Sequence, residues 1–207
     1  MTPRRSPTPD ERRRDPERAK QRLLDAAAEE FGAKGFTGAR VRDIAARAGL
    51  NQQLISYYFG GKAGLYEALQ RRWGETSHEL GRPELPLTEV VVNFLRAAYA
   101  NRPWARLLVW QNLSDDSRPE DQDDLMRWMV TDLRRRQAAG ELAADLDPAH
   151  VGLMLFAAAA APVILPHVAR AISGNDPDSE EFQEAYGRQL TRLVGHLAAA
   201  PAGHDSP

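Results

Sequence analysis

Apolar residues recur along this chain every three or four positions, which is the spacing of helices with one buried face. The first such pattern begins at Glu17, and its apolar positions lie one turn apart: Leu23, Leu24, Ala27, Ala28 and Phe31. Gly32 and Gly35 are expected to end this helix. No segment alternates apolar and polar residues over the length of a strand, so the sequence predicts an all-α fold.

Three shorter helical patterns follow the first one. The apolar positions between residues 41 and 48 predict a helix that ends at Gly49. Asn51 is a suitable N-cap for the next helix, over residues 52–59. A Gly-Gly pair then separates that helix from a fourth, which begins near Lys62 and carries Leu65, Leu69 and Trp73 on one face.

Residues 81–86 are rich in residues that form turns and separate two groups of predicted helices, so we predict a domain boundary near residue 80. Beyond it, five helices are predicted, over residues 87–100, 104–113, 120–139, 148–172 and 179–200. Pro162 and Pro166 fall inside one of these helices and should kink it. The organisation that we predict is a disordered basic tail at residues 1–16, a first helical domain at 17–80 and a second at 81–201.

The composition narrows the class of protein. A chain of 207 residues with 43% hydrophobic residues can bury a core, and the absence of cysteine excludes disulfides and thiolate metal sites. The longest apolar run, residues 153–165, is shorter than the roughly 20 residues that span a bilayer. The N-terminal segment has arginines but no apolar stretch typical of a secretory signal. We therefore expect a cytoplasmic protein that does not insert into a membrane.

The net charge of −2 conceals two oppositely charged parts. Residues 1–73 contain 15 Lys and Arg against 9 Asp and Glu, a net charge of +6, whereas residues 74–207 contain 12 against 20, a net charge of −8. A basic first part suggests a polyanionic partner such as DNA. A solvated basic tail without a partner is the alternative.

Ala45, Gly49 and Ile55 meet the steric requirements of a helix-turn-helix. The small residue lets a second helix cross the first closely, glycine permits the positive φ of a tight turn, and the aliphatic side chain fills the space between the helices. In DNA-binding versions of this motif, the second helix enters the major groove.

The second helix of the motif has a polar outer face when projected at about 100° per residue. Ile55 and Phe59 define the buried side, and Gln53, Tyr57 and Leu54 lie on the opposite side. Glutamine can pair with adenine and an apolar group can contact a thymine methyl, so this face could read bases. The alternative is a packing unit in which the aromatic residues are simply core.

Cationic and phenolic side chains around this helix could contact phosphates. Arg40 and Arg42 precede or begin the first helix of the motif, Tyr58 lies at the flank of the second, and Lys62 opens the next helix. The candidate DNA-binding residues are therefore Arg40, Arg42, Gln52, Gln53, Leu54, Ser56, Tyr57, Tyr58 and Lys62.

Residues 20–70 resemble the N-terminal domain of TetR-type transcriptional regulators. The segments that carry the resemblance are LLDAAAEEFGAKGF, residues 23–36, and VRDIAARAGLNQQLISYYFGGKAGLYEAL, residues 41–69. The second contains the family's pattern Y-x-F-x-x-K-x-x-L, from Tyr57 to Leu65. The chain departs from the family where it has Ala39 and Arg40 in place of a Thr or Ser, Leu54 in place of a small hydroxyl residue, and Ser56 in place of a Tyr.

The resemblance implies a repressor that binds a palindromic operator in double-stranded DNA and is released from it by a small-molecule effector. It also implies a homodimer formed through the last two helices, and an alanine-dense segment near residues 156–172 and an apolar stripe from Phe182 to Leu197 suit such a bundle. Candidate ligand-binding residues are Trp104, Leu108, Gln111, Asn112, Trp128, Met129 and Phe156; plain core packing is the alternative for each.

No catalytic or metal-binding motif is present in the sequence. The five histidines are scattered, and there is no HExxH, GxSxG or Walker sequence. We therefore expect no enzyme activity, no cofactor and no metal. The remaining alternatives are a ligand-independent dimeric DNA-binding protein and, with nothing specific behind it, a small-molecule enzyme.

Overall fold

A computed structural model of the chain describes residues 9–113 and 120–198, with side chains from Pro16 and Asp124 onward in the two ranges. Over these ranges the fold consists of ten helices and no strand, which confirms the predicted all-α class. The first four helices are α1 (Pro9–Gly38), α2 (Val41–Ala48), α3 (Gln53–Phe59) and α4 (Lys62–Leu80). The others are α5 (Leu87–Ala100), α6 (Arg102–Leu113), α7 (Glu120–Ala138), α8 (Pro148–Ile164), α9 (Pro166–Ser173) and α10 (Glu180–Gly195).

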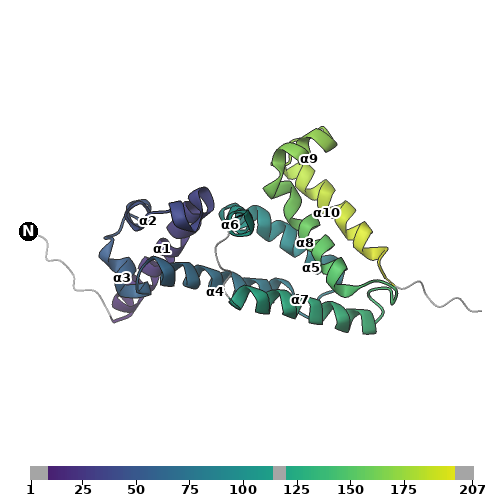
Figure 1. Ribbon diagram of the computed structural model, residues 1–207, viewed down its shortest axis with the longest axis horizontal. Helices are drawn as coiled ribbons and strands as arrows, with labels where there is room; N and C mark the ends of the chain where they lie inside the picture. The colour runs from purple at the N-terminus through teal and green to yellow at the C-terminus, as the bar shows by residue number, and fades with distance from the viewer. Residues whose placement is uncertain (1–8, 114–119, 199–207) are drawn as a thin grey trace, which may run out of the picture.

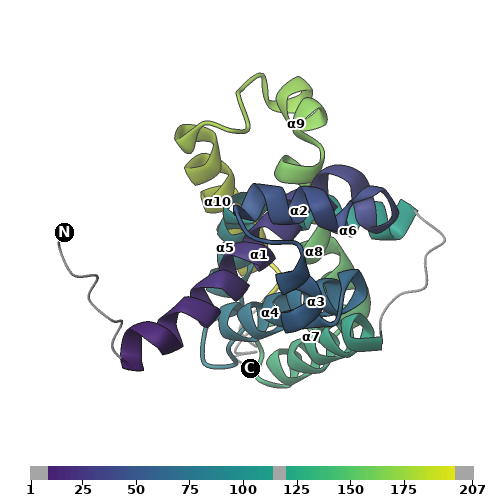
Figure 2. The same ribbon diagram turned by 90° about the vertical axis from the view of Figure 1, so that its left-hand side faces the viewer.

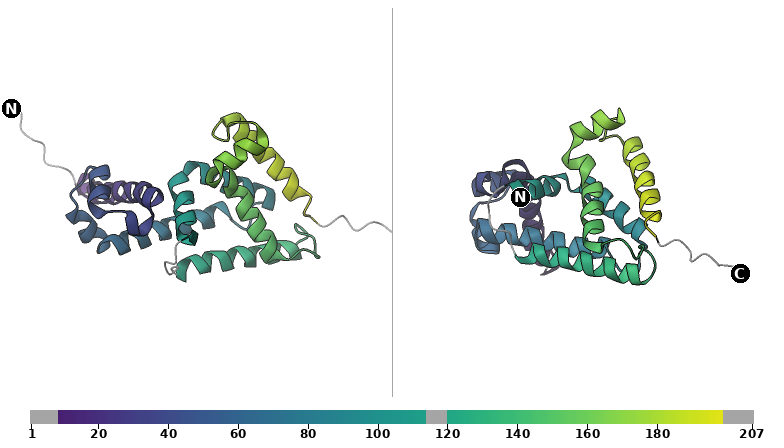
Figure 3. Two further views of the ribbon diagram at one scale, coloured as in Figure 1. Left: turned by 45° about the horizontal axis from the view of Figure 1, so that its top comes forward. Right: turned by 45° about the vertical axis from the view of Figure 1, so that its right-hand side comes forward.

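The elongated molecule has a small group of helices at one end and a larger helical body at the other. Figure 1 shows α1, α2 and α3 together at the left, with α4 running from them along α7 toward the body. Viewed from that end, α1–α4 lie in front of the body (Figure 2). Helices α9 and α10 lie at the far side of the body from α1–α3, as both views of Figure 3 show.

Two clusters of buried side chains form the core. The first joins α1–α4 around Leu23, Phe31, Ile44 and Leu65, and it also takes in Trp104 and other residues of α6. The second joins α5, α7, α8 and α10, and includes Leu95, Leu133, Leu155 and Leu190. Because α6 contributes to the first cluster, the two groups of helices are packed on one another rather than merely linked.

Helix α1 differs from its predicted bounds at both ends. It begins at Pro9, not at Glu17, and continues past Gly32; residues 1–8 of the predicted tail lie outside the described residues. The break comes at Gly35, whose φ of 67° and ψ of 175° are not helical. Gly32 lies within the helix, and its missing side chain lets α6 cross closely, because a Cβ at this position would lie 2.4 Å from the carbonyl oxygen of Pro103.

The predicted helix over residues 148–172 is two helices. Helix α8 ends at Ile164 and α9 begins at Pro166, with a bend of 92° between them. A proline disfavours helical dihedrals in the residue before it, and Leu165 has a φ of −125°. In the described part of the chain no single helix is long and apolar enough to cross a membrane, although α8 and α9 pass that test by length and composition when taken together.

The predicted apolar stripe on α10 packs mostly inside the chain. Leu190 and Val194 are buried, and the Tyr186 hydroxyl donates to the carbonyl oxygen of Ala158 in α8 at 2.8 Å. Leu193 is the exception, with 55% of its surface exposed. The buried members of the stripe therefore pack within the chain, and the predicted dimer interface through α10 stays a prediction.

Candidate DNA-binding surface and internal cavity

The turn between α2 and α3 has the geometry that the sequence predicts. Gly49 has a φ of 62° and a ψ of 37°, a left-handed conformation that favours glycine, and its N–H donates to the carbonyl oxygens of Ala45 and Ala46. Ala45 and Ile55 are both buried between the helices. The Asn51 side chain accepts a hydrogen bond from the N–H of Gln53 at 2.8 Å, so it caps α3 as expected.

Hydrogen bonds and ion pairs fix this motif against α1. Arg22 of α1 donates to the carbonyl oxygen of Ala48, the last residue of α2. Glu30 is 2% exposed and forms an ion pair with Lys34 and another with Arg47 of α2, the latter at 3.8 Å. The orientation of α2, and with it that of α3, is therefore set by α1.

The outer face of α3 is polar and exposed. Gln53, Ser56 and Tyr57 are exposed, and Tyr57 has 79% of its surface accessible. Leu54 differs from the prediction, because it is half-buried and packs against the first core cluster. Leu54 was expected to contact a thymine methyl, but part of its side chain packs α3 against the rest of the molecule.

The phosphate-contact candidates lie around α3, at the same end of the molecule. Arg40, Arg42 and Gln52 are exposed, whereas Tyr58 is half-buried, with its ring centroid 5.0 Å from that of Tyr57. Arg40 caps α2 through its carbonyl oxygen, which accepts from the N–H of Ile44. Arg42 donates to Asp43 at 3.3 Å, and this contact is the main reason why the pKa of the Asp43 carboxyl is lowered.

Lys62 lies at the N-terminus of α4 and folds back onto the molecule. Its Nζ lies 4.6 Å from the centre of the Phe36 ring and donates to the carbonyl oxygen of Thr37 at 3.4 Å. Burial lowers the pKa of this ammonium group. The ammonium group is therefore held against the end of α1.

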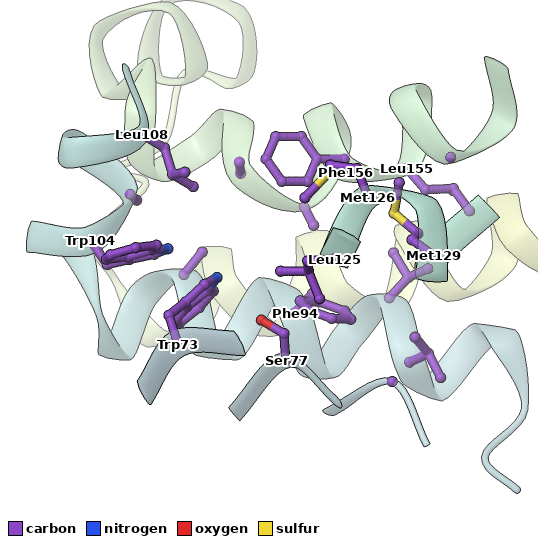
Figure 4. A pocket seen from close by; sticks show the side chains of 18 of the residues that line it. Trp73, Ser77, Phe94, Trp104, Leu108, Leu125, Met126, Met129, Leu155 and Phe156 are labelled. Atoms are coloured by element: carbon purple, nitrogen blue, oxygen red, sulfur yellow. The ribbon is translucent and has the colours of Figure 1, made fainter. Parts of the chain in front are cut away.

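A cavity of about 340 Å³ lies in the helical body, as seen from close by in Figure 4. Its walls come from α4, α5, α6, α7 and α8, and most of the lining side chains are aliphatic or aromatic. Trp73 of α4 stacks on Trp104 of α6 at one end, with ring centroids 5.5 Å apart. A volume of roughly 300–1,000 Å³ is usual for pockets that bind small molecules.

Six of the seven candidate ligand-binding residues line this cavity: Trp104, Leu108, Asn112, Trp128, Met129 and Phe156. Gln111 does not, because its side chain turns toward α4 and donates to the hydroxyl of Tyr66. Trp73 and Ser77 also line the cavity, although the predicted boundary near residue 80 places them in the first domain. Trp73, Ser77 and Gly81 are four residues apart, so they lie on one face of α4 that continues into the helical body. This spacing could have identified Trp73 and Ser77 as lining residues.

The tight turn at Gly49 and the exposed polar face of α3 are those of a helix-turn-helix motif, and comparisons with known proteins identify the family of the chain. The model for bacterial regulatory proteins of the tetR family matches residues 23–69, and that for the tetracyclin repressor-like C-terminal domain matches residues 87–192. The chain belongs to the TetR family and is a DNA-binding transcriptional regulator.

Individual relatives resemble the chain over most or part of its length. The HTH-type transcriptional repressor SCO4008 of Streptomyces coelicolor is 27% identical over 188 residues, which cover 87% of this chain and 97% of the relative. The HTH-type transcriptional repressor NicS of Pseudomonas putida is 31% identical over 106 residues, 47% of this chain and 50% of that protein. The solved structure of SCO4942 from Streptomyces coelicolor is 26% identical, covers 88% of this chain and 99% of its own, and has a TM-score of 0.71.

Proposed function

We propose that the chain is a homodimeric repressor that binds a palindromic operator through α3 and leaves it when a small molecule enters the cavity. The observation that carries the proposal is the position of α4. This helix begins with Lys62, directly after the Gly-Gly pair that follows α3, and Ser77 in its last turn and its C-cap Gly81 line the cavity. One rigid element thus connects a base-reading surface with a ligand-sized space.

The reading surface consists of Gln53, Ser56 and Tyr57. A glutamine can pair with an adenine through two hydrogen bonds, which discriminates bases, and the neighbouring hydroxyl groups can bind either bases or phosphates. Lys62 and the first free amides of α4 supply phosphate contacts, which hold the helix in register without reading sequence.

A ligand can change DNA affinity only if it binds two arrangements of the protein differently. In this proposal, a ligand packed against Trp73 and Ser77 favours a position of α4 in which the two α3 helices of the dimer no longer match adjacent turns of the major groove. The presence of a cavity supports this function over a regulator whose body only dimerises, because that alternative needs no cavity.

Apolar side chains exposed on the last long helices support the homodimer. Leu153 and Met154 of α8 are 65% and 66% exposed, and Leu193 of α10 is 55% exposed. Two-fold pairing of α8 and α10 would cover these side chains in a four-helix arrangement. It would also give the two copies of α3 that a palindromic site requires.

The experiment that tests the proposal selects fragments from genomic DNA with the purified protein and maps the bound sequence. We expect an inverted repeat whose half-sites are one helical turn apart, and release of the fragment by a small molecule from a metabolite screen. Equal retention of the selected fragment and a shuffled version of it would refute sequence-specific binding. A screen in which compounds bind the protein but never alter its DNA affinity would refute ligand control.

A further inference from the structure

The cavity in the helical body is bounded mainly by aliphatic and aromatic side chains. Figure 4 shows such side chains from several helices around one space, among them Phe94 of α5, Met129 of α7 and Phe156 of α8. The volume of about 340 Å³ is far larger than the space that a single bound water requires. The cavity can therefore hold a molecule of many atoms.

Most polar groups of the lining are already bonded to the protein or closed off from the cavity. The amide groups of Asn101 and Asn112 each donate to a backbone carbonyl oxygen one turn earlier, at 3.1 and 2.7 Å. The hydroxyl oxygen of Ser77 and the Nε1 of Trp104 are enclosed by protein atoms, so a molecule in the cavity does not reach them. A buried water requires two to four polar partners, and this lining offers few. An apolar molecule therefore fits the space better than water does.

The lining also offers no free charge to an ionic ligand. Among the lining side chains that the structure describes, there is no Lys, Arg or His, so no cation is available for a carboxylate or phosphate. Asp132 is the one acidic residue among them, and it pairs with Arg135 at 2.8 Å and with Arg136 at 2.5 Å. Its charge is already compensated. An ion of either sign would thus lose its hydration in the cavity without gaining a counter-charge, which is costly.

We infer that the effector is an uncharged, hydrophobic molecule that is held by contact with the apolar walls and requires no ionic partner. This inference rests on the proposed function, since it names the class of ligand that would occupy the cavity. Two small residues of the lining, Ala98 of α5 and Ala160 of α8, leave space that a larger side chain would fill. The size of the molecule that fits is therefore set in part by these two alanines.

Three probes that share a phenylbutyl skeleton test the inference on the full-length protein: butylbenzene, 4-phenylbutyrate and 4-phenylbutylammonium. Trp73, Trp104 and Trp128 line the cavity, so tryptophan fluorescence reports its occupancy. We expect butylbenzene to bind at least about tenfold more tightly than either ion, because only the ions lose their hydration without gaining a counter-charge. Equal or tighter binding of either ion, or no binding of butylbenzene, would overturn the inference.

Two substitutions show whether the probe occupies the cavity. Ala98→Leu and Ala160→Leu each add atoms to its wall, so each should weaken butylbenzene binding by at least about fivefold, because the interior is closely packed and the added atoms take space from the probe. Ala138→Leu is the matched control, because it adds the same side chain at the exposed end of α7, outside the cavity, and should leave the affinity unchanged. Circular dichroism checks that each variant is folded. If a folded Ala98→Leu or Ala160→Leu variant bound butylbenzene as tightly as the unmodified protein, the probe would bind elsewhere and the inference would be wrong.

The outcome separates this inference from the proposed function. A protein that binds its selected DNA fragment but prefers one of the ions, or binds none of the three probes, would overturn the ligand class and leave DNA binding intact. A protein that shows the predicted preference for butylbenzene but binds its selected and shuffled fragments equally would overturn the proposed function, while the ligand class of the cavity stands.

Discussion

Gln53 offers the sharpest test of base reading at the scale of single residues. Its side chain is exposed on α3, and its backbone N–H donates to the Asn51 side chain. The start of α3 therefore does not depend on the side-chain amide of Gln53. Gln53→Ala should therefore cost about 1–3 kcal/mol of binding free energy at the operator and leave the fold unchanged. Titration of the selected fragment and of a shuffled duplex, followed by fluorescence anisotropy, measures this loss.

The control for Gln53 is Thr131→Ala, which removes an exposed polar side chain from α7, away from α3 and from the proposed dimer interface. We expect this control to bind both duplexes as the unmodified protein does. If Gln53→Ala weakened the operator and the shuffled duplex to the same extent, Gln53 would be a backbone contact and the base-reading role would be wrong.

Lys62 should act on all DNA sequences alike. Lys62→Gln removes one cation beside α3, so the affinity should fall for any duplex and the slope of log K against log salt should become shallower by about one. Lys62→Arg should restore most of the affinity, because the charge returns. Binding isotherms at several salt concentrations test this, and an unchanged slope for Lys62→Gln would show that Lys62 does not contact phosphate.

Sequence periodicity predicted most of this surface, and its one error has a physical cause. The projection of α3 placed Gln53 and Tyr57 opposite Ile55, and the structure has the first two exposed and the third buried. Leu54 was predicted to be exposed too, but it packs against the first core cluster. A single-helix projection leaves out neighbouring helices, and α4 packs along α3 closely enough that a long side chain can reach shared apolar surface.

At the scale of elements, one buried guanidinium connects α7 to the chain around the start of α5. Arg136 is fully buried, donates to the carbonyl oxygen of Leu85 at 2.7 Å, and pairs with Asp132 and Glu141. Arg136→Leu would remove one of the two cations that pair with Asp132, the ion pair with the partly exposed Glu141 and the donor to the carbonyl oxygen of Leu85, so the free energy of unfolding should fall by about 3 kcal/mol. Chemical denaturation monitored by circular dichroism measures this change.

Arg135 provides the comparison for Arg136, because it belongs to the same turn and also pairs with Asp132, yet its side chain is 46% exposed. Exposed pairs are screened by water, so Arg135→Leu should change the free energy of unfolding by less than about 1 kcal/mol. If the two substitutions lowered the free energy of unfolding by the same amount, the burial of Arg136 would add nothing to the packing of α7 against the start of α5.

The break between α8 and α9 shows what sequence can and cannot specify about an element. Pro162 and Pro166 correctly predicted a distortion, but not that Pro162 would remain inside α8 while Pro166 starts a new helix. A proline is tolerated in the first turn of a helix, where its missing N–H has no intrahelical role. Which proline terminates the helix depends on packing in the body, and local sequence does not contain that information.

At the scale of the whole molecule, the packing of α6 on α1 depends on Gly32. The hypothetical Cβ lies too close to the backbone of Pro103, which cannot move like a flexible side chain. Gly32→Ala should separate the two helices slightly and lower the free energy of unfolding by about 1–3 kcal/mol, as overpacking does elsewhere. Gly74→Ala in α4 is the control, because a Cβ there has nothing within 4 Å and should leave stability unchanged or raise it.

The proposed dimer is the last property that belongs to the whole molecule. Leu193 is 55% exposed on α10, and Met154 is 66% exposed on α8, so neither side chain has an intrachain reason to be apolar. Leu193→Glu and Met154→Glu would place a carboxylate in an apolar interface, where an unpaired charge is costly to bury. Each variant should shift the protein from dimer to monomer in multi-angle light scattering.

Ala138→Glu adds the same charge to the exposed end of α7 and should leave the dimer intact. Loss of dimerisation should also carry a defined cost in DNA binding. A monomer has a single α3 helix, so it should bind an isolated half-site as well as it binds the full inverted repeat, whereas the dimer gains from occupying both half-sites at once. If both glutamate variants remained dimeric and kept their preference for the repeat, α8 and α10 would not form the subunit interface.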